Sequence, residues 1–364
     1  MKINTLKLVN FRNYEHIQLH FNKGLNIIYG NNGEGKTNIV EAIYVLALTK
    51  SFRTNNDRIL IKNGGLSTKI EGEVEDSNLE NYQIVISKEG KKVKIDNNLI
   101  SKISDYISNI NIIILEPEEQ TIFVDSPASR RKLLNIEISQ LYKDYIIVLN
   151  SYNKLLKQRN FYLRELYING NRSFDYLDIL TKELINYGIK VYNYRLDFIN
   201  KINEYINIYY NEIFENGELN VKYLSDYNNK SVNDLLDIYK NNYNKEIILG
   251  KTLLGIHHDD LVFILDDKNI AEWGSNGQRK NAILSFKLSE IEIFKKEKNT
   301  YPILILDDIF SALDNKKIKN IIKKLNRDIQ TFITTTDLAK IPKKLIKDAK
   351  LFKIFEGKIE EVLK

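Results

Sequence analysis

The sequence predicts an α/β fold, and three observations support this prediction. A short apolar run near the N-terminus leads into a glycine-rich loop and then into a helical pattern. A second apolar run near the C-terminus ends in two adjacent aspartates. Between them lies a long stretch of apolar residues at helical spacing. Strands that alternate with helices in this way form a sheet covered by helices, and the middle stretch predicts an inserted helical arm.

Composition limits the class of protein. The 364 residues are 28% charged and 43% hydrophobic, which is typical of a globular chain large enough for two or three domains. The start, MKINTLKLVN, lacks the apolar core of a signal peptide, and no run is long enough to span a membrane. We therefore expect a cytoplasmic protein without a membrane partner. The absence of cysteine excludes disulfides and thiolate metal sites, and the net charge of +6 alone is weak evidence for DNA binding.

The first apolar run, Leu25 to Tyr29, predicts a buried strand, and Ile39 to Leu46 continues at helical spacing. The loop between them matches the P-loop pattern G-x-x-x-x-G-K-[ST]. We predict that this loop binds ATP through Gly30, Asn31, Asn32, Gly33, Glu34, Gly35, Lys36 and Thr37. Its glycines let backbone N–H groups face the phosphates, Lys36 adds a positive charge, and the Thr37 hydroxyl is a predicted Mg²⁺ ligand.

The second apolar run, Ile303 to Leu306, predicts a central strand that ends at Asp307 and Asp308. A P-loop needs a carboxylate for its metal, so Asp307 is the second predicted Mg²⁺ ligand. Asp308 is the candidate to orient or deprotonate the attacking water. Lys36, Asp307 and Asp308 are thus the predicted catalytic residues. The alternative is that the two aspartates merely cap a helix.

The stretch WGSNGQRKN, Trp273 to Asn281, forms a small turn ahead of a helical pattern that continues from Ala282. Such a turn suits an anion, because the first N–H groups of a helix have no internal partners. Ser275, Gly277 and Gln278 resemble the Ser-x-Gly-Gln signature of the ABC ATPase class. In that class the signature binds the γ-phosphate held by a second protomer. One copy of each element in one chain therefore implies an ATP-dependent homodimer.

The same resemblance covers shorter stretches. Ser311 to Asp314 looks like the D-loop, and the switch position holds a threonine, about Thr335, where transporters commonly carry histidine. Arg12 resembles an arginine that reaches nucleotide phosphate in related heads, with an ordinary surface arginine as the alternative. Glu118 stands near the place of the Q-loop, with a plain turn acid as the alternative.

The insert between Lys36 and Ser275 decides the subclass. Apolar residues recur at helical spacing from Leu141 to Leu156 and again from Leu177 to Val191, with a break at INGNRS. This pattern predicts a helical arm with a hairpin turn, too short for the coiled coils of SMC proteins. We expect domains at 1–125 (head), 126–245 (arm) and 246–364 (head).

Nearly the whole chain resembles the RecF family of bacterial recombination mediators. The stretches that carry the resemblance are NFRNY, the P-loop, SFRT, LEPEEQTIFVDSPASRRKLL, YNKLLKQRN, GIHHDDL, the signature and LILDDIFSALD. Two departures lie in GIHHDDL, where Ile256 stands in place of the usual proline and His258 in place of a basic side chain. The resemblance implies a P-loop ABC-ATPase head of SMC/RecF type with weak, DNA-stimulated hydrolysis. It also implies that the protein acts with RecR and RecO to place RecA on gapped DNA.

The predicted DNA partner is duplex DNA or a junction of single and double strands, bound without sequence readout. Phosphate contacts by lysine and arginine would suffice for this. The candidates are Arg130, Arg131, Lys132, Lys154, Lys157 and Arg159, with solvated helix faces as the alternative. His257 is a candidate for a contact with DNA or with the partner chain, and a structural histidine is the alternative. The lysines between Asp314 and Ile329 fit the solvated face of an amphipathic helix.

Two other functions remain open from sequence. One is a nucleotide-gated DNA-binding adaptor that has no functional turnover. The other is a different ABC ATPase subunit, such as a transporter ATPase, which the long insert and the missing switch histidine disfavour.

Overall fold

The computed structural model describes residues 1–170, 174–214, 217–311, 313–324, 328–355 and 357–362. The chain forms two compact units. The first comprises Met1–Gln120, Tyr205–Gly217 and Asn276–Lys364, and the second comprises Thr121–Glu204 and Glu218–Ser275. The α/β fold with an inserted helical arm is thereby confirmed. The domain limits predicted at residues 126 and 245 remain a prediction. The compact units are divided differently, with residues 246–275 in the same unit as the arm helices and Tyr205–Gly217 in the same unit as the P-loop.

The first unit contains a six-stranded sheet that carries the P-loop. Its order is β15-β14-β3-β13-β12-β8, and all neighbouring strands are parallel except β14 and β15. The strands are β3 (Leu25–Tyr29), β8 (Ile112–Leu115), β12 (Ile303–Asp307), β13 (Thr331–Thr335), β14 (Lys350–Phe355) and β15 (Lys358–Val362). Every residue of β8, β12 and β13 is buried, as expected of parallel strands covered on both faces. The predicted strands that begin at residues 25 and 303 are thus confirmed.

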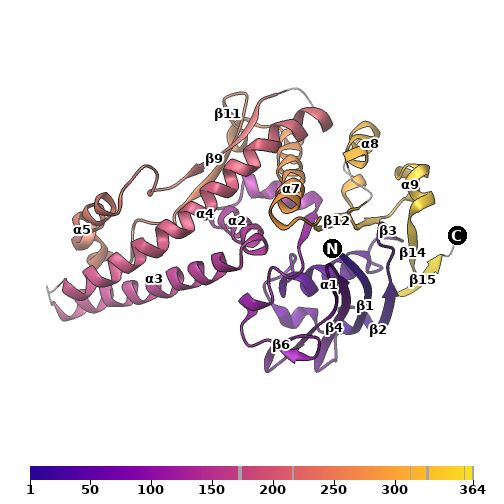
Figure 1. The fold of residues 1–364 in the computed structure, drawn as a ribbon, viewed down its shortest axis with the longest axis horizontal. Coiled ribbons are helices and arrows are strands. Elements are labelled where there is room, and N and C mark those ends of the chain that lie inside the picture. The colour runs from indigo at the N-terminus through magenta and orange to yellow at the C-terminus, as the bar shows by residue number, and fades with distance from the viewer. Residues whose placement is uncertain (171–173, 215–216, 312, 325–327, 356, 363–364) are drawn as a thin grey trace. The chain divides into compact units, whose positions relative to one another are not determined.

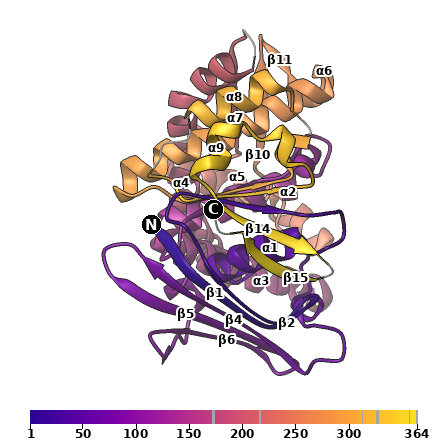
Figure 2. The same ribbon diagram turned by 90° about the vertical axis from the view of Figure 1, so that its right-hand side faces the viewer.

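A second, antiparallel sheet belongs to the same unit (Figure 2). Its strands in order are β2 (Tyr14–His20), β1 (Lys2–Phe11), β4 (Ser67–Glu75), β5 (Leu79–Ser87), β6 (Gly90–Ile95) and β7 (Asn98–Leu99). Burial alternates along β4, so one face of this sheet packs on the core. Helix α1 (Lys36–Leu48) contacts strands of both sheets and is buried along almost its whole length.

The described part of the first unit also contains the helices α7 (Asn276–Lys298), α8 (Asn315–Lys324) and α9 (Lys343–Asp348). Helix α8 is the predicted amphipathic helix, and it turns Ile318 and Ile321 into the core. Helix α7 begins at Asn276, earlier than the apolar pattern from Ala282 indicates. Gly277 and Gln278 therefore lie in its first turn rather than before it.

The second unit consists mainly of helices. They are α2 (Pro127–Leu141), α3 (Lys143–Asn169), α4 (Asp175–Ile213, whose end belongs to the first unit) and α5 (Val232–Leu249). The two longest of them, α3 and α4, lie next to each other in Figure 1. The unit also contains a small sheet of β9 (Leu219–Leu224), β10 (Asp260–Leu265) and β11 (Lys268–Asn269) and the short helix α6 (Ile270–Trp273).

The predicted hairpin of the arm is formed by α3 and α4. Gly170, with a φ of 61°, ends α3 in the left-handed conformation that glycine adopts readily. Residues 171–173 of the predicted break lie outside the described residues. No helix in the described part of the chain combines the length and the apolar composition needed to span a lipid bilayer.

Candidate nucleotide-binding site

The P-loop follows β3 and leads into α1, as the sequence predicts. Gly35 has a φ of 109°, and a Cβ there would lie 2.6 Å from Asn13 Nδ2 and 2.8 Å from the Tyr14 hydroxyl. A Cβ on Gly30 would lie 2.4 Å from the Ile354 carbonyl oxygen. Only glycine fits at these two positions, so the backbone can curl close to its neighbours.

Lys36 lies across this loop. Its ammonium donates hydrogen bonds to the carbonyl oxygens of Gly30, at 2.9 Å, and Asn31, at 2.7 Å. Burial lowers the pKa of Lys36, while the nearby charges of Asp308, Glu34 and Asp307 act in the opposite direction. A cation held at the loop in this way is placed to meet the negative charge of a phosphate.

The side chain of Glu34 turns back onto the P-loop and bonds Asn31. Its carboxylate accepts hydrogen bonds from the backbone N–H of Asn31, at 2.8 Å, and from Asn31 Nδ2, at 3.1 Å. Asn32 and Gly33 are exposed at the tip of the loop. The Asn31 amide that a phosphate would use is therefore already bonded to a carboxylate.

Asp307 meets Thr37 at the carboxyl end of β12. The Thr37 hydroxyl donates to Asp307 Oδ1 at 3.2 Å, and the Thr334 hydroxyl donates to the same oxygen. Burial raises the pKa of Asp307. Its oxygen and the Thr37 hydroxyl are hard oxygen donors of the kind that Mg²⁺ prefers.

Asp308 adopts the left-handed conformation, with a φ of 49°. Its backbone N–H donates to the Thr334 hydroxyl at 2.9 Å, and its Oδ2 accepts a hydrogen bond from Ser311 Oγ at 3.1 Å. Its Oδ1 is buried without a hydrogen-bond partner among the described residues. An orphaned carboxylate oxygen beside Asp307 fits a site that takes a metal or a water, so the residues present fit ATP with Mg²⁺.

Thr334 is a site residue that the sequence analysis missed. Its hydroxyl connects the Asp307 carboxylate to the Asp308 backbone, whereas the hydroxyl of Thr335, the predicted switch residue, bonds the backbone of Asp337. The alternation of side chains along β13 could have indicated this difference, because neighbouring residues of a strand point to opposite faces.

Arg12 engages a buried glutamate. Its guanidinium forms a bidentate ion pair with Glu41 of α1, at 2.8 Å from Nε and 2.6 Å from Nη2. Glu41 is 0% exposed and also accepts hydrogen bonds from Ser51 Oγ and from Arg53 Nη1. The NFRNY and SFRT stretches thus meet at Glu41, which sequence reasoning missed because a glutamate in a helix ordinarily faces solvent.

The NFRNY stretch also supports the loop directly. Asn13 bonds the Glu34 carbonyl oxygen and the Asn38 side chain, and the Tyr14 hydroxyl donates to the Gly35 carbonyl oxygen. These contacts hold the loop and the first turn of α1 in one arrangement.

The signature turn stands at the start of α7. Ser275 and Gly277 are exposed, Gln278 is half-buried, and Trp273 is exposed just before them. A helix of 23 residues begins here, so its N-terminus carries the positive end of a helix dipole. The hydrogen bonds of the Lys36 ammonium go to Gly30 and Asn31, and that of the Thr37 hydroxyl goes to Asp307, so none of these three bonds involves a signature residue.

The D-loop stretch is described in part, since Ala312 lies outside the described residues. Ser311 bonds Asp308, and the Asp314 carboxylate accepts a hydrogen bond from the Lys317 N–H in the first turn of α8. Asp314, and not Asp307 or Asp308, is therefore the aspartate that caps helix α8. The side chain of Glu118 also lies outside the described residues, and the neighbouring Glu119 carboxylate lies 3.5 Å from the buried Lys287 ammonium.

The structure contradicts the prediction that Arg159 contacts DNA. Its guanidinium is 0% exposed and bonds Thr181 Oγ1, Thr252 Oγ1 and the Glu246 carboxylate at 2.9, 2.7 and 2.7 Å. Lys154 and Lys157 lie three residues apart and are exposed on α3, but Arg159 comes two residues later. Residues two apart point to nearly opposite sides of a helix, so Arg159 faces inward.

Arg130 is likewise structural. It forms a bidentate ion pair with Asp260 and bonds the carbonyl oxygens of Ile122 and Asp125. With every nitrogen engaged and the side chain largely buried, it holds together the interior of the second unit. Arg131 is half-buried against the Asp259 carbonyl oxygen, and Lys132 is exposed.

The GIHHDDL stretch lies mostly in the interior of the second unit, with His258 exposed. The ring Nδ1 of His257 and the Tyr152 hydroxyl are 2.7 Å apart, and burial lowers the pKa of His257 to about 4. Ile256 is buried, and its carbonyl oxygen accepts a hydrogen bond from Arg195. His258 Nε2 lies 3.4 Å from the Thr252 carbonyl oxygen. These contacts favour the structural alternative for His257.

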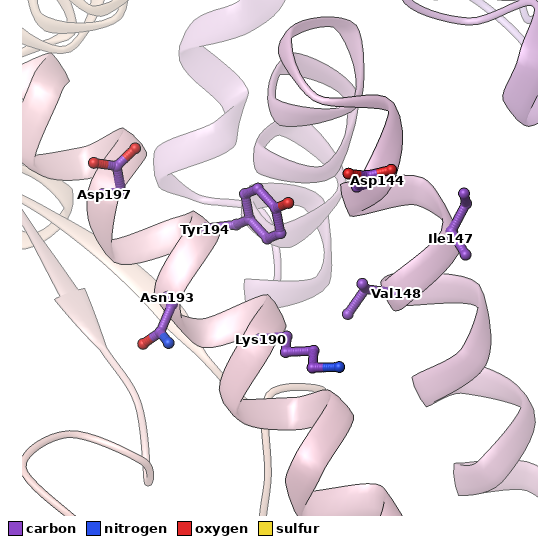
Figure 3. A pocket seen from close by; sticks show the side chains of 7 residues that line it. All are labelled: Asp144, Ile147, Val148, Lys190, Asn193, Tyr194 and Asp197. Carbon is purple, nitrogen blue, oxygen red and sulfur yellow. The ribbon is translucent and has the colours of Figure 1, made fainter.

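A hollow of about 560 Å³ lies between α3 and α4 (Figure 3). Its lining includes the carboxylates Asp144 and Asp197, the ammonium of Lys190 and the ring of Tyr194. The opposite charges of its lining give it no preference for a phosphate.

Residues 2–357 match the family described as RecF/RecN/SMC N terminal domain. The chain is 38% identical to the DNA replication and repair protein RecF of Ligilactobacillus salivarius, over 99% of this chain and 98% of that protein. It is 38% identical to the protein of the same name from Enterococcus faecalis, over 99% of both chains.

Solved structures of RecF and of an SMC head are also similar to this chain. The structure of the recombination mediator protein RecF-ATP in the RecFOR pathway matches with a TM-score of 0.92 and 29% identity, over 100% of this chain and 98% of that chain. An SMC head bound to the C-terminal winged-helix domain of ScpA matches with a TM-score of 0.59 at 15% identity, which shows similarity of fold alone.

Proposed function

Because the chain belongs to the RecF family of the RecF/RecN/SMC group, we propose that it is an ATP-dependent DNA-binding protein of recombinational repair. In this proposal it hydrolyses ATP weakly and in response to DNA. An ATP-driven homodimer closes on duplex DNA near single-strand gaps and helps RecR and RecO to load RecA.

The observation that carries the ATPase part is the meeting of Thr37 and Asp307 beside Lys36. Thr37 and Asp307 would hold Mg²⁺, which would neutralise charge on the phosphates of ATP. Lys36 and the N–H groups of Gly30 to Thr37 would bind the phosphates. Asp308 would orient the attacking water or take its proton, and its unpartnered buried Oδ1 is available for this role. Arg12 would act on the nucleotide only after a change in its ion pair with Glu41.

The signature supports the dimer. Ser275 and Gly277 are exposed at the start of a long helix, where the positive end of the helix dipole stabilises an anion. We propose that Ser275, Gly277 and Gln278 bind the γ-phosphate of ATP held by a second copy of the chain. Two composite sites then form from two chains, and closure depends on ATP.

DNA binding is assigned to exposed cations of the second unit. Lys154 and Lys157 share one face of α3, and Lys132 is exposed on α2. Their contacts would be with phosphates and hence independent of sequence and sensitive to salt. Arg131 contributes in part, since its guanidinium is half-buried.

A nucleotide-gated adaptor without functional turnover is the second candidate. Both candidates require a phosphate to displace the Glu34 carboxylate from the Asn31 N–H, so this contact does not separate them. The two candidates differ in whether hydrolysis releases DNA.

Sedimentation velocity distinguishes the proposals. The chain alone should sediment as a monomer, should become a dimer with ATP and Mg²⁺, and should bring duplex DNA into the dimer peak. In the proposed function, DNA leaves that peak as ATP is consumed. A complex that persists unchanged after all ATP is hydrolysed would favour the adaptor, and a monomer under every condition would contradict both.

A further inference from the structure

A groove of about 1060 Å³ lies in the first unit, between α8 and α9 and along the strands β3 and β13. Figure 1 and Figure 2 both show α8 and α9 close to this sheet. The predicted ATPase and DNA-binding roles use none of its residues.

The floor of the groove is apolar. Ile318 of α8, Ile333 of β13 and Ile341 before α9 are buried, and Leu25 of β3 and Leu345 of α9 are half-buried. A groove of this size exceeds the need of most small molecules and can take several side chains of a peptide.

The rim of the groove is positively charged. Five exposed lysines line it: Lys319, Lys323, Lys340, Lys343 and Lys344. Asp348 is the one carboxylate among the described lining residues. In the described part of the chain none of these five ammonium groups forms an ion pair, although Lys317 nearby is paired with Asp314. The rim therefore favours an occupant with several negative charges.

The groove lies at the opposite end of the sheet from the nucleotide site. Strands β3 and β13 are parallel, and Leu25 pairs with Thr331 at their amino ends while Tyr29 pairs with Thr335 at their carboxyl ends. The groove includes Leu25 and Thr331, whereas the P-loop follows Tyr29. An occupant of the groove leaves the P-loop accessible.

From this arrangement we propose that the groove is a docking site for an acidic amphipathic segment of a protein partner. Apolar side chains on one face of the segment enter between α8 and α9, and its carboxylates meet the lysines of the rim. The apolar floor distinguishes this occupant from DNA, whose backbone would meet the lysines but would leave the floor exposed to water.

The test uses the full-length protein and a fluorescein-labelled synthetic helix with leucine at positions i, i+3, i+4 and i+7 and glutamate elsewhere. Fluorescence anisotropy should show saturable binding. Lys319→Glu/Lys343→Glu should weaken it at least tenfold, and Leu345→Ser should weaken it with the rim charges unchanged. The matched control, Lys88→Glu/Lys92→Glu, changes charge equally at exposed lysines of the second sheet and should bind as the unaltered protein does.

Hydrogen exchange identifies the surface that the helix occupies. Protection should rise in residues 318–323 and 341–345. The proposal is wrong if the labelled helix does not bind, if both double variants weaken it equally, or if protection rises elsewhere. It is also overturned if Lys319→Glu/Lys343→Glu weakens binding of duplex DNA, or if it abolishes ATP-dependent dimerisation, which would assign the groove to a second copy. ATP hydrolysis measured on the same variants reports separately on the nucleotide site.

Discussion

The Thr37 hydroxyl lies 3.2 Å from Asp307 Oδ1, although 270 positions separate the two residues in the chain. The contact joins the first turn of α1 to the carboxyl end of β12. Both ends of the chain are therefore needed to build one nucleotide site, and the arm can be inserted between them without disturbing it. The proposed binding of Mg²⁺ and ATP depends on this contact between a P-loop hydroxyl and a buried carboxylate.

Asp308→Asn tests the assignment of the water-activating residue. The change removes a carboxylate and keeps Asp307, so ATP binding should persist while turnover falls by at least a hundredfold. Gel filtration with ATP should show a dimer that holds duplex DNA longer than the unaltered protein does. If the variant cannot bind ATP, Asp308 is a metal or folding residue instead.

Thr334→Val tests the residue that the sequence analysis missed. The valine removes the hydroxyl that donates to Asp307 and accepts from the Asp308 N–H. Because groups that orient a metal-binding carboxylate typically contribute a factor of about 10 to 100, steady-state ATPase activity should fall by roughly that factor. The matched control is Thr335→Val, whose hydroxyl bonds the Asp337 backbone and should matter much less. Equal losses in the two variants would contradict the role of Thr334.

Arg159→Ala should destabilise the protein rather than its complex with DNA. Removal of one partner from a buried ion pair costs about 3 to 5 kcal/mol, because the Glu246 charge stays buried. Urea unfolding should show this loss, while Lys154→Ala/Lys157→Ala should leave the free energy of unfolding nearly unchanged and weaken DNA binding in a salt-dependent way. The opposite pattern would restore Arg159 as a phosphate contact.

His257 should make stability depend on pH. Burial lowers its pKa from 6.5 to about 4, so the unfolded chain binds a proton that the folded chain does not bind between these values. The contribution of His257 to the free energy of unfolding is complete above pH 6.5 and is lost as the pH falls toward 4. From pH 7.5 to 5.0 the loss due to this residue should be about 2 kcal/mol.

The comparison for this pH effect uses two glutamine variants. His257→Gln should lose less stability over that range than the unaltered protein, and His16→Gln, at an exposed position, should behave like the unaltered protein. An unchanged pH dependence in His257→Gln would show that the ring binds its proton as readily in the folded protein as in the unfolded chain.

Local patterns allowed the P-loop, β12 and the arm helices to be predicted from the sequence. The strand, the glycine-rich loop and the helix of the P-loop follow one another within a short stretch of sequence, and the apolar run that ends at Asp307 is also a local pattern. The antiparallel sheet of β1, β2 and β4 to β7 was not predicted, because its pairings join segments that are far apart in the chain.

The missed and mistaken residues depend on tertiary contacts. From the sequence alone Glu41 would be expected on the surface of a helix. In the structure it is buried against Arg12 and Ser51. Arg130 was grouped with exposed cations because its partner Asp260 lies 130 positions away. Arg159 differs, since its spacing from Lys157 already indicated the opposite face of α3.

The most direct test of the shared nucleotide site mixes two inactive variants. Ser275→Arg places a long cation in the signature, and Lys36→Arg replaces the compact ammonium of the P-loop with a planar guanidinium. A hybrid dimer has one composite site with both defects and one with neither. The control mixes Lys36→Arg with the double variant Lys36→Arg/Ser275→Arg, in which no hybrid site is intact. Our account predicts ATPase activity in the first mixture, well above that of either variant alone, and none in the control. Activity in the first mixture no higher than the sum of its components, with hybrid dimers shown to form, would contradict a site shared between two chains.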